Sequence, residues 1–421
     1  MRSLRLRLFL PFALGFMALA FFGVPTLRAA AWVQPLSHPA PLATPTPEVQ
    51  VESVHVTYAF HRTLRVSVTF QAPFRIRSVT FLWYVKGNLF PYSQAMEGQG
   101  NTWWVEIPLN PAETSEGIPP FATVFYWFQV EGEGGVVDET PAFTFEYVDD
   151  RFVWRSIRSP HVVVHHPPAL EGTATQVLDY AQAALERMRI RWLAPLPLQT
   201  VHLYLYPSKE DFESLFPTTE PWVGSQALPP FNLVYLPADL SPPLLEAATA
   251  HELGHVVLYH AVQGNHERLP WWLWEGIPSL SEPEFRAKYQ TEIQRAWEAG
   301  TLYPLSRLCE RKNPRSSGVW LQYAQAASFT YFLYHRFGAR SLQELIHAYV
   351  AGASCEYGPK QVYGMSLSRL EALWKQEGLA YSTSAFQGRL PQILLGTLVL
   401  GSGLFSSGLV LWWIHRQRRP W

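Results

Sequence analysis

Residues 251–255 read His-Glu-Leu-Gly-His, a set of side chains that can bind a metal ion and move a proton. Four residues of α-helix turn the chain by about 400°, so both imidazoles would leave the same helix face roughly 6 Å apart along the axis. His251 and His255 could therefore share one metal ion. Glu252, rotated by about 100° from the first histidine, would reach a metal-activated water without binding the metal.

Two histidines are too few, because a catalytic zinc usually takes three protein ligands and keeps a fourth position for water. Residues 271–276 read Trp-Trp-Leu-Trp-Glu-Gly and supply a carboxylate in an otherwise apolar segment. An ionised carboxylate among tryptophans is costly to bury without a cation. We therefore expect Glu275, on the next helix, to be the third ligand of a single Zn²⁺ ion.

Such a site predicts hydrolysis of peptide bonds without a covalent intermediate. Zinc lowers the pKa of a water towards about 7, and Glu252 would take its proton and later protonate the leaving amine. The pattern His-Glu-x-x-His is expected by chance in about one in a hundred chains of this length. The uncharged flanks at 248–250 and 256–258, together with the later glutamate, favour the metal site over chance.

The motif is expected inside a helix. Ser241 can cap that helix with Pro242 at its first position, and the apolar run from Leu244 to Ala261 contains no proline. Polar residues around the motif leave no apolar span of 18 residues, which argues against an intramembrane peptidase. The segments predicted before it are a helix, a strand and a hairpin at a sheet edge: Thr173–Trp192, Val201–Tyr206, and Trp222–Leu228 with Phe231–Leu236.

These residues resemble the gluzincin metallopeptidases, and more closely the bacterial peptidase MA-like domains, whose signature is His-Glu-x-x-His followed by Trp-x-x-Glu-Gly. The resemblance covers roughly residues 150–380. It implies an α+β zincin-like domain over 150–385 with a helical C-terminal half, and an edge strand within Trp222–Leu236 that pairs with an extended substrate. It also implies that Glu282 orients a ligand histidine, the alternative being a solvent-facing carboxylate.

The resemblance further implies a tyrosine or histidine that stabilises the oxyanion. Tyr323 is the candidate, while Tyr331, Tyr334 and His335 on the same predicted helix remain alternatives, as does a purely packed aromatic ring. Pro278 departs from the family pattern, so the second helix is expected to start later or to kink. The chain lacks the Gly-x-Met-Glu-Asn motif of gluzincin aminopeptidases, which favours an endopeptidase.

Residues 51–149 predict a second domain, an all-β, Ig-like sandwich of about seven strands. Its short runs are rich in Val, Phe, Tyr and Trp and include Leu64–Phe70, Ser78–Val85, Trp103–Ile107 and Val124–Val130. No chemistry is recognisable there. The alternative function for the whole chain is a membrane-anchored binding protein that uses this sandwich and has an inactive peptidase domain.

Both ends predict a membrane location. Residues 1–31 have a basic start and an apolar run typical of a signal peptide, with an uncleaved anchor as the alternative, and a Pro-rich linker follows over 32–50. Residues 391–414 predict a transmembrane helix, and the basic tail at 415–421 predicts a cytoplasmic C-terminus. We expect a single-pass protein of the cytoplasmic membrane whose N-terminal body is extracytoplasmic.

The composition bounds the partners. Among 421 residues, 33 Lys and Arg balance 34 Asp and Glu, so no global field favours nucleic acid. The expected partners are a protein or peptide substrate and the membrane, with the oligomeric state left open. Cys309 and Cys355 are too few for a disulfide framework or a tetrathiolate site, and a single bridge and two separate thiols remain equally open.

Overall fold

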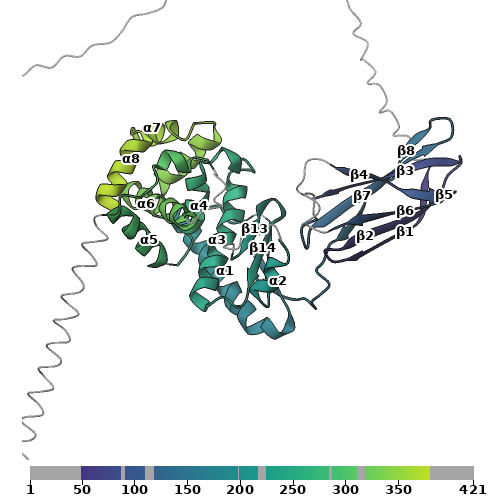
Figure 1. The fold of residues 1–421 in the computed structure, drawn as a ribbon, viewed down its shortest axis with the longest axis horizontal. Helices are drawn as coiled ribbons and strands as arrows, with labels where there is room; N and C mark the ends of the chain where they lie inside the picture. The colour runs from purple at the N-terminus through teal and green to yellow at the C-terminus, as the bar shows by residue number, and fades with distance from the viewer. Residues whose placement is uncertain are drawn as a thin grey trace, which may run out of the picture. The chain divides into compact units, whose positions relative to one another are not determined.

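A computed structural model describes residues 49–86, 91–109, 118–197, 199–216, 224–283, 287–310 and 318–379 (Figure 1). The predicted signal peptide, transmembrane helix and basic tail lie outside the described residues, as does the linker except for its last two positions. Within the described ranges, no helix has both the length and the apolar character needed to cross a bilayer.

The N-terminal region consists of two antiparallel sheets that share one aromatic and aliphatic core. Alternate residues of the long strands Thr63–Gln71 and Thr123–Gly132 are buried, as period-two patterning predicts. The first sheet is ordered β1 (Gln50–Ala59), β2 (Thr63–Gln71), β6 (Thr102–Pro108) and β5 (Glu97–Gln99). The second is ordered β4 (Tyr92–Ala95), β3 (Ile76–Val85), β7 (Thr123–Gly132) and β8 (Val137–Glu139), with β9 (Phe143–Glu146) also paired to β7.

The described part of this region has nine strands, more than the seven expected. Four of the nine strands are short, with three or four residues in each of β4, β5, β8 and β9. A strand of that length shows too little alternation to be recognised from sequence. The first strand begins at Gln50, the last residue of the predicted linker.

A third sheet begins the second region. Its order is β10 (Arg155–Arg158), β11 (Val162–His166), β12 (Val201–Tyr206), β14 (Leu233–Pro237) and β13 (Gln226–Leu228). The three central strands are parallel, and β10 and β13 pair antiparallel at the two edges. The predicted hairpin is therefore present at an edge, as β13 and β14 joined by the short helix η2 (Pro229–Phe231).

The alternation of side chains along β12 divides this sheet into two packed faces. Val201, Leu203 and Leu205 belong to the core shared with the helices. Tyr204 and Tyr206 point to the opposite face and belong to the aromatic core shared with the first two sheets. The sheet is thus buried on both sides, which explains its nearly continuous apolar sequence.

Eight α-helices lie in the described residues: α1 (Glu171–Arg191), α2 (Lys209–Glu213), α3 (Pro242–Ala261), α4 (Trp271–Ser279), α5 (Ala287–Glu298), α6 (Val319–Val350), α7 (Tyr357–Tyr363) and α8 (Leu367–Leu373). Shorter helical segments are η1 (Pro168–Leu170), η3 (His266–Arg268), η4 (Leu305–Leu308) and the π-helical η5 (Trp374–Leu379). Figure 1 shows α1 and α3 beside the third sheet and the remaining long helices beyond them. The helical C-terminal half is as expected.

Two local expectations need correction. Ser241 stands at the N-cap of α3 with Pro242 at the first helical position, but its side chain makes no capping hydrogen bond. The helix α4 does not start late. It begins at Trp271, immediately after Pro270, and Pro278 falls in its last turn, one residue before the helix ends at Ser279.

Cys309 and Cys355 form a disulfide, which settles the pairing that the sequence left open. The bridge joins the end of η4 to the segment between α6 and α7. The backbone carbonyl of Cys309 also accepts a hydrogen bond of 2.9 Å from the amide of Trp271, the first residue of α4. The bridge therefore stands next to the helix that carries the expected third ligand.

Replacing both cysteines by serine should lower the free energy of unfolding by about 3 to 4 kcal/mol, because the unfolded chain regains the freedom of a closed loop. Denaturant unfolding of the double variant and the parent measures the difference. Addition of a thiol reductant should destabilise the parent by a similar amount and leave the double variant unchanged. Equal stability of the parent and the double variant would contradict the prediction.

Candidate metal centre

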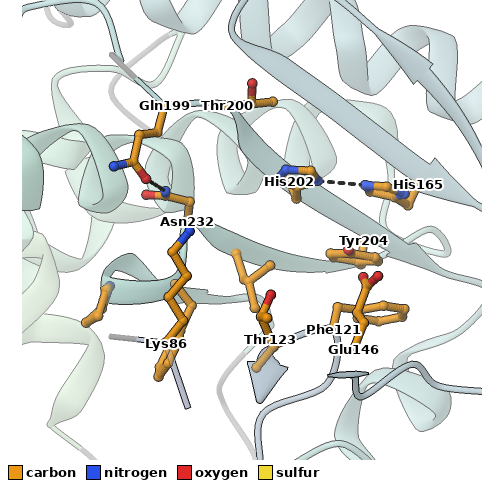
Figure 2. A pocket seen from close by; sticks show the side chains of 14 residues that line it. Lys86, Phe121, Thr123, Glu146, His165, Gln199, Thr200, His202, Tyr204 and Asn232 are labelled. Carbon is orange, nitrogen blue, oxygen red and sulfur yellow. Dashed lines mark hydrogen bonds between the residues drawn. The ribbon is translucent and has the colours of Figure 1, made fainter. Parts of the chain in front are cut away.

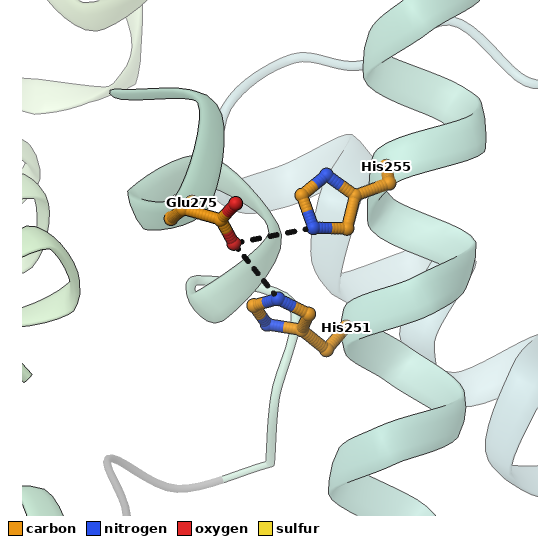
Figure 3. Close-up of side chains that lie close together, drawn as sticks. All are labelled: His251, His255 and Glu275. Carbon is orange, nitrogen blue, oxygen red and sulfur yellow. Dashed lines mark ion pairs between the residues drawn. The ribbon is translucent and has the colours of Figure 1, made fainter. Parts of the chain in front are cut away.

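Helices α3 and α4 bring three candidate ligands together (Figure 3). His251 and His255 project from one face of α3, and Glu275 faces them from α4. The Oε2 atom of Glu275 lies 3.6 Å from Nε2 of His251 and 3.4 Å from Nε2 of His255. The three donor atoms lie within 4.8 Å of one another, and they form the sole such group of three among the described residues.

These distances suit a small divalent cation. Donors held tetrahedrally at about 2.0 to 2.1 Å from zinc are separated from each other by roughly 3.3 to 3.5 Å. Both separations from Glu275 are close to that value. Two imidazole nitrogens and one carboxylate oxygen are also a donor set typical of catalytic zinc, with a fourth position left for water. The residues present therefore fit the ion that the sequence predicted.

Glycines allow the two helices to approach closely enough. A methyl group on Gly254, inside the motif, would lie 2.9 Å from Cα of Pro278 on α4. A methyl group on Gly276 would lie 2.7 Å from the carbonyl oxygen of Ala326 on α6 and would clash with Thr330. A larger residue at Gly254 would push α4 away from α3, and one at Gly276 would push α4 away from α6. Glu275 would move with the helix in either case.

Burial and charge make this group unstable without a cation or protons. Burial alone would lower the pKa of His251, but hydrogen bonds to Glu275 and Glu282 outweigh burial and raise that pKa to about 10. Burial alone would raise the pKa of Glu275, but His255 and His251 lower it to about 2. The carboxylates thus stabilise positive charge between them, whether protons or a metal ion carry it.

Glu282 contacts His251 as expected for a residue that orients a ligand. Its Oε1 atom accepts a hydrogen bond of 3.1 Å from Nδ1 of His251, and its side chain is only 2% exposed. The exposure excludes the solvent-facing alternative. The hydrogen bond fixes the imidazole so that Nε2 points at Glu275.

Two arginines of α1 hold the backbone that carries Glu282. Arg191 donates to the carbonyls of Leu280 and Glu282 at 2.6 and 2.8 Å, and Arg187 donates to the carbonyl of Ser281 at 2.7 Å. These bonds satisfy three successive carbonyls at the end of α4. This support could not be predicted, because the arginines precede the motif by about sixty residues and match no pattern.

Glu252 is buried, with 8% of its surface exposed. Its Oε1 atom accepts a hydrogen bond of 2.8 Å from the hydroxyl of Ser225, directly before the edge strand β13. Glu252 is outside the group of three candidate ligands. Ser225 was missed from the sequence, where it was one residue of a predicted strand.

The candidates for the oxyanion donor occupy different surroundings on α6. The ring of Tyr323 packs edge-on against Trp271, with ring centroids 5.3 Å apart. Tyr331 is exposed and contacts the ring of His335, while Tyr334 packs against the helical core. The role of Tyr323 therefore stays a prediction.

A separate pocket of about 500 Å³ contains none of the three ligands (Figure 2). Nε2 of His165 lies 2.9 Å from Nδ1 of His202, and the ring of His165 stacks on Tyr204. Burial, assisted by His202, lowers the pKa of His165 to about 4, so this imidazole is neutral near pH 7. We assign no chemistry to this pair.

Comparisons with known proteins give one family and no curated relative. A family model described as the peptidase MA superfamily matches residues 181–379. No curated protein matches the chain.

Among solved structures, wild-type OgpA from Akkermansia muciniphila is 15% identical, with 24% of this chain and 29% of that chain covered and a TM-score of 0.19. A catalytically inactive OgpA in complex with an O-glycopeptide substrate is 14% identical, with the same coverage and TM-score. An FN3 domain of human collagen XX is 17% identical, covering 26% of this chain and 99% of that chain, again at 0.19. The match thus spans 29% of either OgpA chain, and a TM-score of 0.19 is too low to indicate a shared fold.

In contrast to the structural matches, the family match covers the candidate metal ligands. Residues 181–379 contain α3 and α4, and with them both histidines of the motif and Glu275. The triad that the fold assembles is a possible metal site of the sort that such peptidases use. Over residues 181–379, the chain therefore matches the peptidase MA superfamily.

Proposed function

We propose that the chain is a zinc-dependent peptidase of the gluzincin type that cleaves within protein or peptide chains. The match of residues 181–379 to the peptidase MA superfamily supports a metallopeptidase and implies such a substrate. The observation that carries the proposal is the convergence of His251, His255 and Glu275, with buried Glu252 beside them on α3. The donor set of two nitrogens and one oxygen supports zinc.

The residues of the site would have three separate roles: metal binding, proton transfer and stabilisation of the oxyanion. His251, His255 and Glu275 would hold the ion, which supplies Lewis-acid activation of the attacking water and the scissile carbonyl. Glu252 would accept the proton of the attacking water and return it to the leaving amine. Tyr323 remains our candidate donor to the oxyanion.

The edge strand β13 (Gln226–Leu228) supports binding of an extended substrate. It pairs with β14 on one side and ends the order of strands in the described sheet. Backbone groups on its other side could pair with a peptide backbone. Its proximity to Glu252 through Ser225 would bring that peptide beside the general base.

We also propose that the catalytic body lies outside the cytoplasmic membrane, anchored by residues 391–414. The apolar and basic patterns at both ends of the sequence support this location. The disulfide between Cys309 and Cys355 adds support, because such bonds persist mainly in oxidising compartments.

Substitution Glu252→Gln should reduce kcat about 100-fold or more while zinc remains bound one to one, because the amide cannot accept the proton. Peptide cleavage and metal content measured on the same preparation test this. His255→Ala is the matched comparison and should lose zinc as well as activity. Unchanged turnover by Glu252→Gln would reject the mechanism and favour an inactive binding protein.

Substitution Glu282→Ala should weaken zinc binding about 10- to 100-fold, because His251 loses the group that orients its ring. Competition with a chromogenic chelator measures the affinity. Glu267→Ala, which removes an exposed carboxylate from η3, serves as the control and should bind zinc as the parent does. Equal affinity of the Glu282 variant and the parent would show that this contact does not support the metal.

External protease added to intact spheroplasts should degrade the catalytic body and leave a tag at the C-terminus protected. The physical reason is the charge asymmetry around residues 391–414, which keeps the basic tail inside. Immunoblots against the tag and the body read the result. Recovery of the full-length chain in the soluble fraction, or digestion of the tag, would contradict the proposed anchoring.

A further inference from the structure

We propose that Ser225 is a positioning residue that holds the Glu252 carboxylate in the orientation for proton transfer and ties it to the edge strand. The inference rests on the proposed function, since it gives that function's general base a partner. Ser225 lies outside both the His-Glu-x-x-His motif and the Trp-x-x-Glu-Gly segment.

Ser225 and Glu252 are in direct contact through their side chains. The hydroxyl of Ser225 donates to Oε1 of Glu252 at 2.8 Å, a normal length for a hydrogen bond to a carboxylate. Within the described ranges, Ser225 supplies the one side-chain hydrogen bond recorded for Glu252. A carboxylate with 8% of its surface exposed needs such a donor, because burial removes most of its contact with water.

The geometry suits a general base. A carboxylate has two oxygens, so a hydrogen bond to Oε1 leaves Oε2 available for the proton of the attacking water. Without the bond, the side chain of Glu252 would be free to rotate about its χ angles, and the fraction of time in the reactive orientation would fall. Since serine donates only one hydroxyl proton, it steadies the carboxylate without replacing its basic function.

The position of Ser225 in the chain gives the contact a second consequence. Ser225 immediately precedes β13, the strand proposed to pair with the substrate backbone. This short segment would therefore position the substrate through the backbone of β13 and position Glu252 through the side chain of Ser225. This arrangement fixes the distance between base and scissile bond through few intervening atoms.

The test uses the zinc-loaded chain and a fluorogenic peptide that the parent cleaves. Ser225→Ala should lower kcat about tenfold with KM within about twofold, since the lost bond acts on the base and not on substrate affinity. Ser225→Thr keeps a hydroxyl and should recover most of the loss. Ser241→Ala is the control, because its side chain makes no capping bond to the same helix.

A double-mutant cycle separates positioning from general damage to the fold. Glu252→Asp shortens the side chain by one methylene, so its carboxylate no longer reaches Ser225. Adding Ser225→Ala to this background should change kcat less than about twofold, because the contact is already absent. A merely structural role would give the same tenfold loss in both backgrounds.

The outcomes are distinct. Parental kcat for Ser225→Ala, an equal loss for Ser225→Thr, or an equal loss in the Glu252→Asp background would each overturn the inference while leaving the peptidase intact. A zinc-loaded parent that cleaves no peptide would overturn the proposed function and this inference together. Loss confined to Ser225→Ala, rescue by threonine and coupling to Glu252 would establish it.

Discussion

The site depends on the close contact between α3 and α4. Glu275 can face both histidines only because the backbone of α4 reaches the surface of α3 at Gly254. Three buried carboxylates and two imidazoles with little exposure then lie in one small region, which is unfavourable unless positive charge lies among them. One divalent cation supplies the charge of two protons, and it suits the spacing of the donor atoms.

The rest of the domain keeps that contact rigid. Helix α1 covers the third sheet and also sends Arg187 and Arg191 to the backbone at the end of α4. On the other side, α4 lies against α6 without room for a methyl group at Gly276. The disulfide adds a covalent restraint next to the start of α4. Each restraint acts on the short helix that supplies Glu275, because a nine-residue helix has little stability of its own.

The edge of the third sheet contributes to the same site from a different direction. Its parallel strands are buried on both faces, so the sheet forms a stiff base for α3. At the edge, Ser225 links β13 to Glu252. The proposed general base is thus held by the sheet, and the proposed metal ligands are held by the helices. Such a division would let substrate binding and metal binding be set by separate parts of one fold.

Much of this could be read from the sequence. The i, i+4 spacing of His251 and His255 fixes their common face, because an α-helix has only one periodicity. The strand Val201–Tyr206 was found with its observed bounds from its apolar run. The short strands of the N-terminal region were missed, because three or four residues carry too little pattern. The start of α4 was misjudged, because a proline's effect depends on its place in the helix.

What the sequence determined by itself was local: which residues share a helix face, which glutamate follows among tryptophans, and where apolar runs form strands. The tertiary structure decided which distant groups meet. Nothing local relates Arg191 to the carbonyl of Glu282, Ser225 to Glu252, or Cys309 to Cys355. Those contacts depend on packing between elements far apart in the chain, where shape and burial select the partner and sequence spacing carries no information.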